Sequence, residues 1–214
     1  MTIVILSNTA NINYFNLLKN CIDSINTKQY QVIVVETNSK LKNKNIPLNA
    51  KFIFPEKEFN YNEFLNIGIR KARDHKYVLA NNDIVFQPGC LEEIEKKLDT
   101  YDSVSPQDID LHKDISEDIL GIKVGYHVLG YCIAITQSTL NTIGEFDEKF
   151  KFWYQDNDYC NNLKKHKLCH ALLSNAKIQH FKGQSHNLLQ DRLYDMTHGL
   201  ENTLKDKWTE YEII

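Results

Sequence analysis

Asp83 is the residue whose surroundings point most clearly to a chemical role. It lies between the apolar runs Tyr77–Ala80 and Ile84–Phe86, and Asn81 and Asn82 directly precede it. This pattern predicts a buried strand that presents polar groups at its carboxyl end. In an open α/β sheet, ligands bind outside the carboxyl ends of the strands, where a carboxylate can hold a divalent cation against a substrate phosphate. A polar turn between two strands is the alternative, since Asn-Asn-Asp also favours turns.

Three other carboxylates have surroundings that could serve chemistry. Glu36 ends the apolar run Val32–Val35, where it could accept hydrogen bonds from a nucleobase or ribose, or be an ordinary loop carboxylate. Asp156 and Asp158 follow the aromatic residues Phe152–Tyr154. Two positions apart on a helix, their side chains diverge, so one can face a cleft while the other caps or packs the helix.

Alternating strand and helix patterns must position these residues. The predicted strands are Ile3–Leu6, Val32–Val35, Lys51–Phe54, Tyr77–Phe86, a short strand ending at Val104–Pro106, Gly130–Thr136, His170–Ser174 and Lys177–His180. The predicted helices are Tyr14–Ile25, Phe64–Ala72, Pro88–Leu98, Ser138–Gly144, Tyr159–His166 and a tail from Ser185. Unbroken apolar strands joined by helices predict an α/β fold with a mostly parallel sheet. The polar, aperiodic stretch Gln107–His127 predicts a binding loop or lid.

The totals limit the class of protein. A chain of 214 residues, 42% of them apolar, predicts one domain, and a net charge of -3 gives no basic field for nucleic acid. The five cysteines are odd in number and form no Cys-x-x-Cys pair, which favours reduced thiols over disulfides or zinc. The first residues predict a strand and not a signal peptide, and no apolar run reaches membrane-spanning length. We therefore expect a cytoplasmic protein without a membrane-spanning segment.

The order of these features resembles that of the family 2 glycosyltransferases, which have the GT-A fold. The segments that carry the resemblance are Val34–Ser39, Phe59–Asn62 through Asn66–Gly68, Asn81–Ile84 (similar to the DXD-type motif), Ile143–Glu148 through Gln155–Asp158, and Lys177–Ser185. The resemblance implies a single Rossmann-type domain with a mixed, mostly parallel sheet flanked by helices. It divides the chain into a nucleotide-binding half (1–100), an acceptor and catalytic half (101–185) and a helical tail (186–214).

The resemblance also implies roles for individual residues. The nucleotide-sugar donor, which we expect to be UDP-linked, would contact Glu36, Asn38, Asn60, Asn66, Asn82 and Asp83. Asp83 would bind Mn²⁺ or Mg²⁺, with His180 as a further metal ligand or phosphate contact; the alternative for His180 is a hydrogen-bonded core histidine. Asp156 would be the general base that activates an acceptor hydroxyl, giving inversion. The acceptor could be a saccharide, a protein or a modified nucleic acid.

Two positions depart from the family pattern. Asn82 occupies the place of the usual first acidic residue of the DXD-type motif, and Gln155 that of the usual Glu before the catalytic Asp. These departures leave open a non-catalytic binding domain with the same fold. A sugar-nucleotide pyrophosphorylase is a further alternative, but it would want a glycine- and lysine-rich loop after the first strand, and Ser7–Asn11 is not one.

Overall fold

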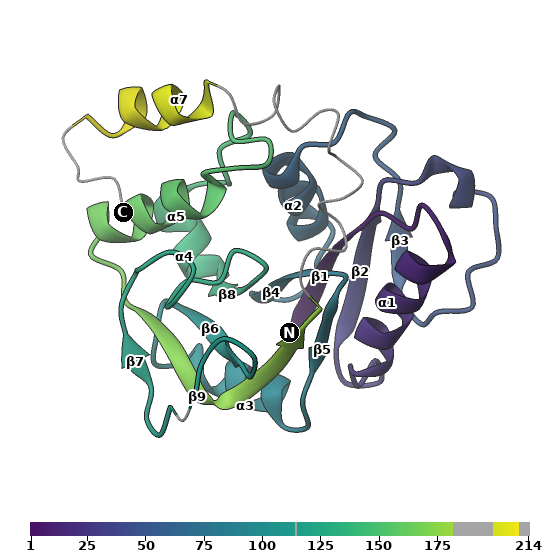
Figure 1. The fold of residues 1–214 in the computed structure, drawn as a ribbon, viewed down its shortest axis with the longest axis horizontal. Coiled ribbons are helices and arrows are strands. Elements are labelled where there is room, and N and C mark those ends of the chain that lie inside the picture. The colour runs from purple at the N-terminus through teal and green to yellow at the C-terminus, as the bar shows by residue number, and fades with distance from the viewer. Residues whose placement is uncertain (114, 182–198, 210–214) are drawn as a thin grey trace.

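One mixed sheet runs through the molecule (Figure 1). The structure is a computed structural model that describes residues 1–113, 115–181 and 199–209. Within these residues the strands are β1 (Thr2–Ser7), β2 (Gln31–Glu36), β3 (Lys51–Ile53), β4 (Lys76–Asn81), β5 (Ile84–Phe86), β6 (Ser103–Asp108), β7 (Ile119–Leu120), β8 (Cys132–Thr136) and β9 (His170–His180). The helices are α1 (Ile12–Asp23), the short 3-10 helix η1 (Ser39–Leu41), α2 (Tyr61–Arg70), α3 (Cys90–Lys97), α4 (Gln137–Ile143), α5 (Gln155–Lys165) and α7 (Leu200–Lys207). The strand order is β3-β2-β1-β4-β8-β6-β9-β5, and β7 pairs with β9.

The first half of the sheet is parallel, as the unbroken apolar strands predict. β1 pairs in parallel with both β2 and β4, and β2 pairs in parallel with β3. Successive side chains of β1 point to opposite faces: Ile3 and Ile5 pack in the cluster that includes α1 and α3, while Val4 and Leu6 pack in the cluster that includes α2, α4 and α5. Helices therefore cover both faces, which confirms the predicted α/β class and the mixed, mostly parallel sheet.

The predicted strand Tyr77–Phe86 is in fact two strands. β4 lies between β1 and β8, whereas β5 leaves the centre of the sheet and pairs antiparallel with β9, with Ile84 opposite His180. Asn82 and Asp83 form the turn between them. The two interpretations of this segment thus both hold, because the polar pair lies at the carboxyl end of β4 and also joins two strands.

The predicted strands His170–Ser174 and Lys177–His180 form the single strand β9. It pairs with β6 in parallel, and the register shifts from Pro106 opposite Leu173 to Gln107 opposite Lys177. Pro106 has no N–H to donate to the ladder, and the backbone N–H and hydroxyl of Ser174 both donate to Asp118 Oδ1 at 3.0 and 3.1 Å. The strand continues through its polar middle because a side chain satisfies the groups that the ladder leaves unpaired.

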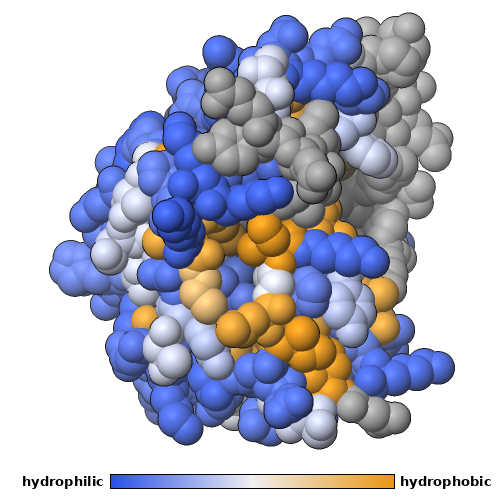
Figure 2. Space-filling model, turned by 90° about the vertical axis from the view of Figure 1, so that its left-hand side faces the viewer, coloured by the Kyte–Doolittle hydropathy of each residue, from blue (hydrophilic) through white to orange (hydrophobic). Residues whose placement is uncertain are grey.

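The stretch Gln107–His127 is more ordered than its composition indicates. Its first two residues belong to β6 and Ile119–Leu120 forms β7. His112, within the same stretch, is buried. Its Nδ1 accepts from Asp108 N at 3.1 Å, and its Nε2 lies 2.8 Å from Tyr126 O. Figure 2 shows the side of the molecule on which β7 lies, where apolar residues gather within a polar border; Leu120 of β7 is 60% exposed.

The helical tail is described in part. Residues 186–198 and 210–214 lie outside the described residues, and α7 lies alongside α5 (Figure 1). Leu204 and Trp208 pack with Phe150 in a small apolar cluster of their own. No helix in the described ranges is long and apolar enough to cross a membrane.

Candidate active site

The carboxyl ends of β1, β2 and β4 meet at one edge of the sheet, where a cavity of about 90 Å³ lies against the ends of β1 and β4. Its lining consists of Leu6, Ser7, Asn8, Phe59, Tyr61, Asn81, Asn82 and Phe152. Phe59 and Phe152 form an aromatic wall, with their ring centroids 6.1 Å apart in an edge-on arrangement. The polar groups come from the strand ends, so a ligand here would have one apolar and one hydrogen-bonding side.

Glu36, at the end of β2, keeps one carboxylate oxygen free. Its Oε1 accepts hydrogen bonds from Thr9 N at 3.1 Å and Asn38 N at 2.7 Å, and Asn38 in turn donates to Thr9 O at 2.8 Å. Its Oε2 is buried without a partner, although the residue is only 1% exposed. An unpaired buried acceptor costs about 1–3 kcal/mol, so this oxygen needs a ligand donor or a water. Glu36 and Asn38 thus lie together at the end of β2, and their contact with a donor stays a prediction.

Asn82 binds the neighbouring strand. Its Nδ2 donates to Ser7 Oγ at 3.2 Å, which links the ends of β1 and β4, and the residue also lines the cavity. With Asn at position 82 the side chain donates to Ser7, whereas the acidic residue usual in the DXD-type motif could only accept from the serine hydroxyl. Asn81 accepts from the Tyr61 hydroxyl at 3.1 Å.

Asp83 and His180 are brought together by the pairing of β5 with β9. Both side chains are largely buried, and Asp83 Oδ1 lies 3.3 Å from His180 Nε2. Asp83 Oδ1 and His180 Nδ1 both lack hydrogen-bond partners. The main chain fixes the pair, because Phe181 N donates to Asp83 O at 2.9 Å.

This pair fits a divalent cation with few protein ligands. Neighbouring ligand atoms around a Mg²⁺-sized ion, each at 2.0–2.1 Å, are about 3 Å apart in an octahedron. The described residues contain no group of three or more His, Cys, Asp or Glu side chains arranged to hold a metal. A cation at Asp83 and His180 would therefore need further oxygen ligands from substrate phosphates and water, which is the usual situation for Mg²⁺.

Asp156 lies in the first turn of α5, which follows Tyr154 in a left-handed conformation with φ of 64°. Its Oδ1 accepts from Asn157 N at 3.0 Å, and burial raises the pKa of its carboxyl group. The side chain lines a small internal cavity together with Tyr61, Gly130 and Gln155. In the described part of the chain no basic side chain forms an ion pair with Asp156, so its carboxylate is available to accept a proton.

Asp158 points elsewhere, as the spacing predicts. Its Oδ1 accepts from Trp208 Nε1 at 2.8 Å and lies 2.8 Å from Lys207 Nζ, both from the end of α7. Burial nevertheless raises the pKa of Asp158, against the opposite effect of Lys207. Asp156 therefore faces the small internal cavity, and Asp158 anchors α7.

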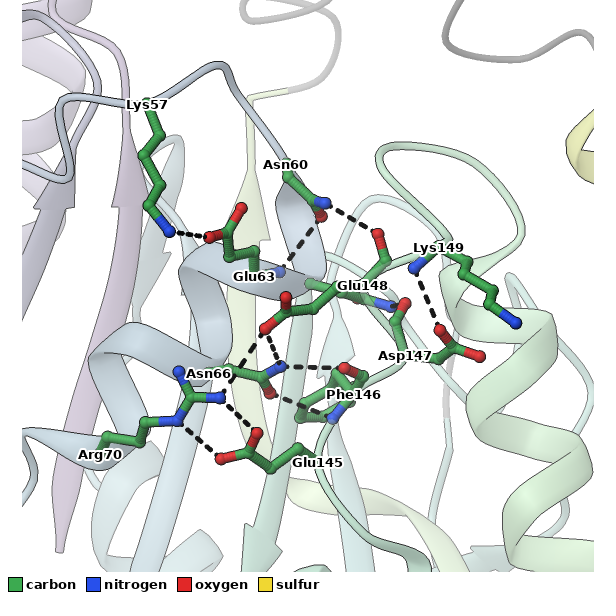
Figure 3. A network of polar contacts seen from close by, with 11 residues as sticks. Lys57, Asn60, Glu63, Asn66, Arg70, Glu145, Phe146, Asp147, Glu148 and Lys149 are labelled. Carbon is green, nitrogen blue, oxygen red and sulfur yellow. Dashed lines mark hydrogen bonds and ion pairs between the residues drawn. The ribbon is translucent and has the colours of Figure 1, made fainter.

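Asn60 and Asn66 lie outside the cavity lining, and both bind the segment around Phe146 and Glu148 instead (Figure 3). Asn60 caps α2 by accepting from Glu63 N at 3.2 Å, and its Nδ2 donates to Glu148 O at 2.8 Å. Asn66 exchanges hydrogen bonds with the main chain of Phe146, at 2.9 and 3.0 Å. Both carboxamides thus hold the loop that precedes the segment carrying Asp156, and a direct contact with a donor stays a prediction.

Several other residues of the site are not distinguished by any pattern in the sequence. Tyr61 and Asn81 belong to segments that resemble the family, and Phe152 belongs to the aromatic run before Asp156. No pattern distinguishes these three residues as cavity residues. The sequence predicts Tyr131 only as part of the strand Gly130–Thr136, although its ring stacks on His180 with centroids 3.9 Å apart. A glycine–aromatic pair directly before a central strand is the one signal that pointed to it.

No family model and no curated protein matches the sequence. The structure is similar to that of TarS from S. aureus (residues 1–349), with a TM-score of 0.58, 15% identity, and coverage of 83% of this chain and 59% of that one. The complex of that protein with UDP-GlcNAc gives a TM-score of 0.59 at 14% identity, covering 86% and 59%. The mannosyltransferase PcManGT from Pyrobaculum calidifontis, in complex with GDP-Man and Mn²⁺, gives 0.60 at 14% identity, covering 86% and 57%.

These similarities show that the chain has the GT-A fold that the sequence predicts. The chain spans less than two thirds of the length of each of these proteins. At this level of identity the similarity concerns the fold alone.

Proposed function

We propose that this protein is a glycosyltransferase that moves a sugar from a nucleoside-diphosphate donor to an acceptor hydroxyl, with inversion and with help from a divalent cation. One observation carries the proposal. Two buried acidic side chains at the same edge of the sheet, Glu36 and Asp83, each keep an oxygen without a protein partner. A molecule with hydrogen-bond donors at one end and cation-binding phosphates further along would satisfy both.

The geometry of Glu36 favours a uracil base. Its Oε1 already accepts two backbone N–H groups, which leaves Oε2 as the one free acceptor. The pairing edge of uracil presents a single N–H donor between two carbonyl oxygens. Guanine presents two adjacent donors and would match a carboxylate with both oxygens free. We therefore favour a UDP-linked donor over a GDP-linked one.

Asp83 and His180 are the proposed ligands of Mn²⁺ or Mg²⁺. The donor diphosphate would supply further oxygen ligands. A divalent cation bound there would neutralise the charge that develops on the leaving diphosphate. Asn82 and Ser7 support Asp83 from the side, since their hydrogen bond fixes the end of β4 from which Asp83 follows.

Asp156 is the proposed general base. Burial raises its pKa, which makes its carboxylate a stronger proton acceptor than an exposed aspartate. It would take the proton of the acceptor hydroxyl while the oxygen attacks the anomeric carbon from the side opposite the diphosphate, and this direct displacement inverts the configuration. The amino end of a helix favours negative charge, so the position of Asp156 in the first turn of α5 opposes the effect of burial on its carboxylate.

The first test is thermal unfolding with UDP-, GDP-, dTDP- and CMP-linked sugars, each with and without Mn²⁺. A ligand that binds only the folded protein raises its stability, by about 2.7 kcal/mol at a concentration 100 times the dissociation constant. We expect a Mn²⁺-dependent increase with UDP-sugars that Asp83→Ala removes. Asp23→Ala is the matched control, since Asp23 lies on the outer face of α1 in an ion pair with Lys19. No increase with any nucleotide sugar would refute the proposal.

Turnover separates an enzyme from a binding domain. A glycosyltransferase without its acceptor slowly hydrolyses its donor, so released UDP can be measured while the acceptor is unknown. Nucleotide-sugar binding with no UDP release by the unaltered protein, and none with any hydroxyl acceptor, would favour the non-catalytic binding domain.

A further inference from the structure

His180 has an unusual setting for a metal ligand. A metal-binding histidine almost always donates its second ring N–H to a carboxylate, a carbonyl or a water, and this contact fixes the orientation of the ring. His180 Nδ1 is buried and has no such protein partner in the described ranges. Its backbone is fixed by the pairing of β9 with β5, but that pairing does not decide which way the imidazole turns.

The ring of Tyr131 supplies the missing constraint. It lies almost parallel to the His180 imidazole, with ring centroids 3.9 Å apart and an interplanar angle of 19°. Such a stack allows the imidazole to slide but opposes its rotation out of the plane. In this orientation His180 Nε2 lies 3.3 Å from Asp83 Oδ1.

Tyr131 is itself held at two points. Its backbone carbonyl accepts from Asn81 N at 3.0 Å, which joins it to the end of β4. Its hydroxyl donates to Asp108 Oδ2 at 2.8 Å. Asp108 is fully buried, and its second oxygen accepts from Asp110 N at 3.0 Å. Tyr131 is therefore held at the end of β4 through its backbone and at the end of β6 through its hydroxyl, which fixes the plane of its ring.

We propose that Tyr131 is the positioning residue that orients His180 toward Asp83 for cation binding, through the stacking of its ring on the imidazole. This inference rests on the proposed function, since it concerns the cation of the donor site. Stacking replaces the hydrogen bond that fixes most metal-binding histidines, so the aromatic ring matters more than the hydroxyl group.

The test measures Mn²⁺ binding by the electron paramagnetic resonance of the free ion, in the presence of UDP, for the unaltered protein and for variants of Tyr131. Tyr131→Leu and Tyr131→Met remove the ring, and we expect either to weaken Mn²⁺ binding about 10- to 100-fold, the usual effect of losing a residue that supports a metal ligand. Tyr131→Phe keeps the ring and should stay within a few-fold of the unaltered protein. Tyr126→Leu is the matched control, because the ring of Tyr126 packs edge-on against His112 and His127, whereas that of Tyr131 stacks on His180.

A second readout does not depend on metal. The ring protons of His180 should resonate upfield in the metal-free protein because they lie against Tyr131, and Tyr131→Leu should abolish this shift while Tyr131→Phe retains it. Unchanged Mn²⁺ affinity in a folded Tyr131→Leu or Tyr131→Met protein would overturn the inference and leave the proposed function intact. UDP binding without Mn²⁺ binding in the unaltered protein would also overturn it. Binding of neither UDP nor UDP-sugars would instead overturn the proposed function.

Discussion

Gly130 and Asp156 approach so closely that a methyl group on the glycine would touch the carboxylate. A Cβ at position 130 would lie 3.1 Å from Asp156 Oδ2 and 3.4 Å from Asp156 Cβ. The carbonyl of Gly130 accepts from the Tyr61 hydroxyl at 2.8 Å, so the glycine backbone is held from the other side. The position of the proposed base therefore depends on the absence of a side chain at position 130, just before β8.

Gly130→Ala should lower the rate of UDP release from a UDP-sugar without changing the affinity for UDP. The new methyl group has to push the Asp156 carboxylate by a few tenths of an ångström, and a displacement of about 1 Å can cost about 100-fold in rate. We expect a loss of about 10-fold. The rate is measured by released UDP and the affinity by thermal unfolding. An unchanged rate would show that Asp156 does not act at this position.

Asp156→Asn should abolish most turnover and yet stabilise the protein at neutral pH. Loss of a general base costs about 100- to 10,000-fold in rate. Burial raises the folded-state pKa above the unfolded value of 3.8, so Asp156 stabilises the fold below that value and this contribution is lost as the pH rises through the raised pKa. The melting temperature of the variant should therefore exceed that of the unaltered protein at pH 7, and the difference should shrink toward pH 3. A lower melting temperature at pH 7 would contradict this.

His170 should make the protein sensitive to acid. Burial lowers the pKa of this imidazole from 6.5 to about 4, and its ring nitrogens contact Ser103 Oγ at 2.8 Å and His127 O at 3.0 Å. Because the folded pKa is depressed, the neutral ring contributes stability above pH 6.5 that is lost as the pH falls through about 4, a change of roughly 3 kcal/mol at most. Urea unfolding from pH 7 to pH 4 should show this decline, and His170→Gln should flatten it. A decline of equal slope in the variant would assign the acid sensitivity to other groups.

The same substitution should destabilise the protein much more at Trp208 than at Trp153. Trp208 donates its indole N–H to the buried carboxylate of Asp158, and Trp208→Phe leaves that acceptor with one partner fewer. We expect a loss of about 1–3 kcal/mol in the free energy of unfolding. Trp153 is 46% exposed, and Trp153→Phe should change stability by no more than about 0.5 kcal/mol. Equal effects in urea unfolding would mean that α7 does not dock on Asp158 in solution.

The strand ends were the part of the fold that the sequence predicted best. Glu36 and Asp83 follow apolar runs whose length and β-branched composition indicate buried parallel strands, so their place at the carboxyl edge of the sheet follows from local pattern. The divergence of Asp156 and Asp158 likewise follows from helical spacing alone. In these cases the position of the side chain depends only on the burial of neighbouring residues in the sequence and on helical geometry.

Long-range pairing was the part that local pattern could not predict. β5 continues the apolar run of β4, and only its pairing with β9 separates the two. The predicted strand His170–Ser174 stops in the middle of β9, because the Asp118 side chain that satisfies Ser174 comes from a distant loop. The pairing of His180 with Asp83 came from resemblance, and the contact of Tyr131 with His180 had no signal in spacing at all.

The pairing of β5 with β9 has a consequence for synthesis of the protein. β1 to β4 leave the ribosome early, but Asp83 is held by Phe181 and faces His180, near the end of the described sheet. A nascent chain that has exposed the whole nucleotide-binding half still lacks the strand that completes the proposed cation site. The proposed cation site therefore forms only after β9 has been synthesised and has paired with β5.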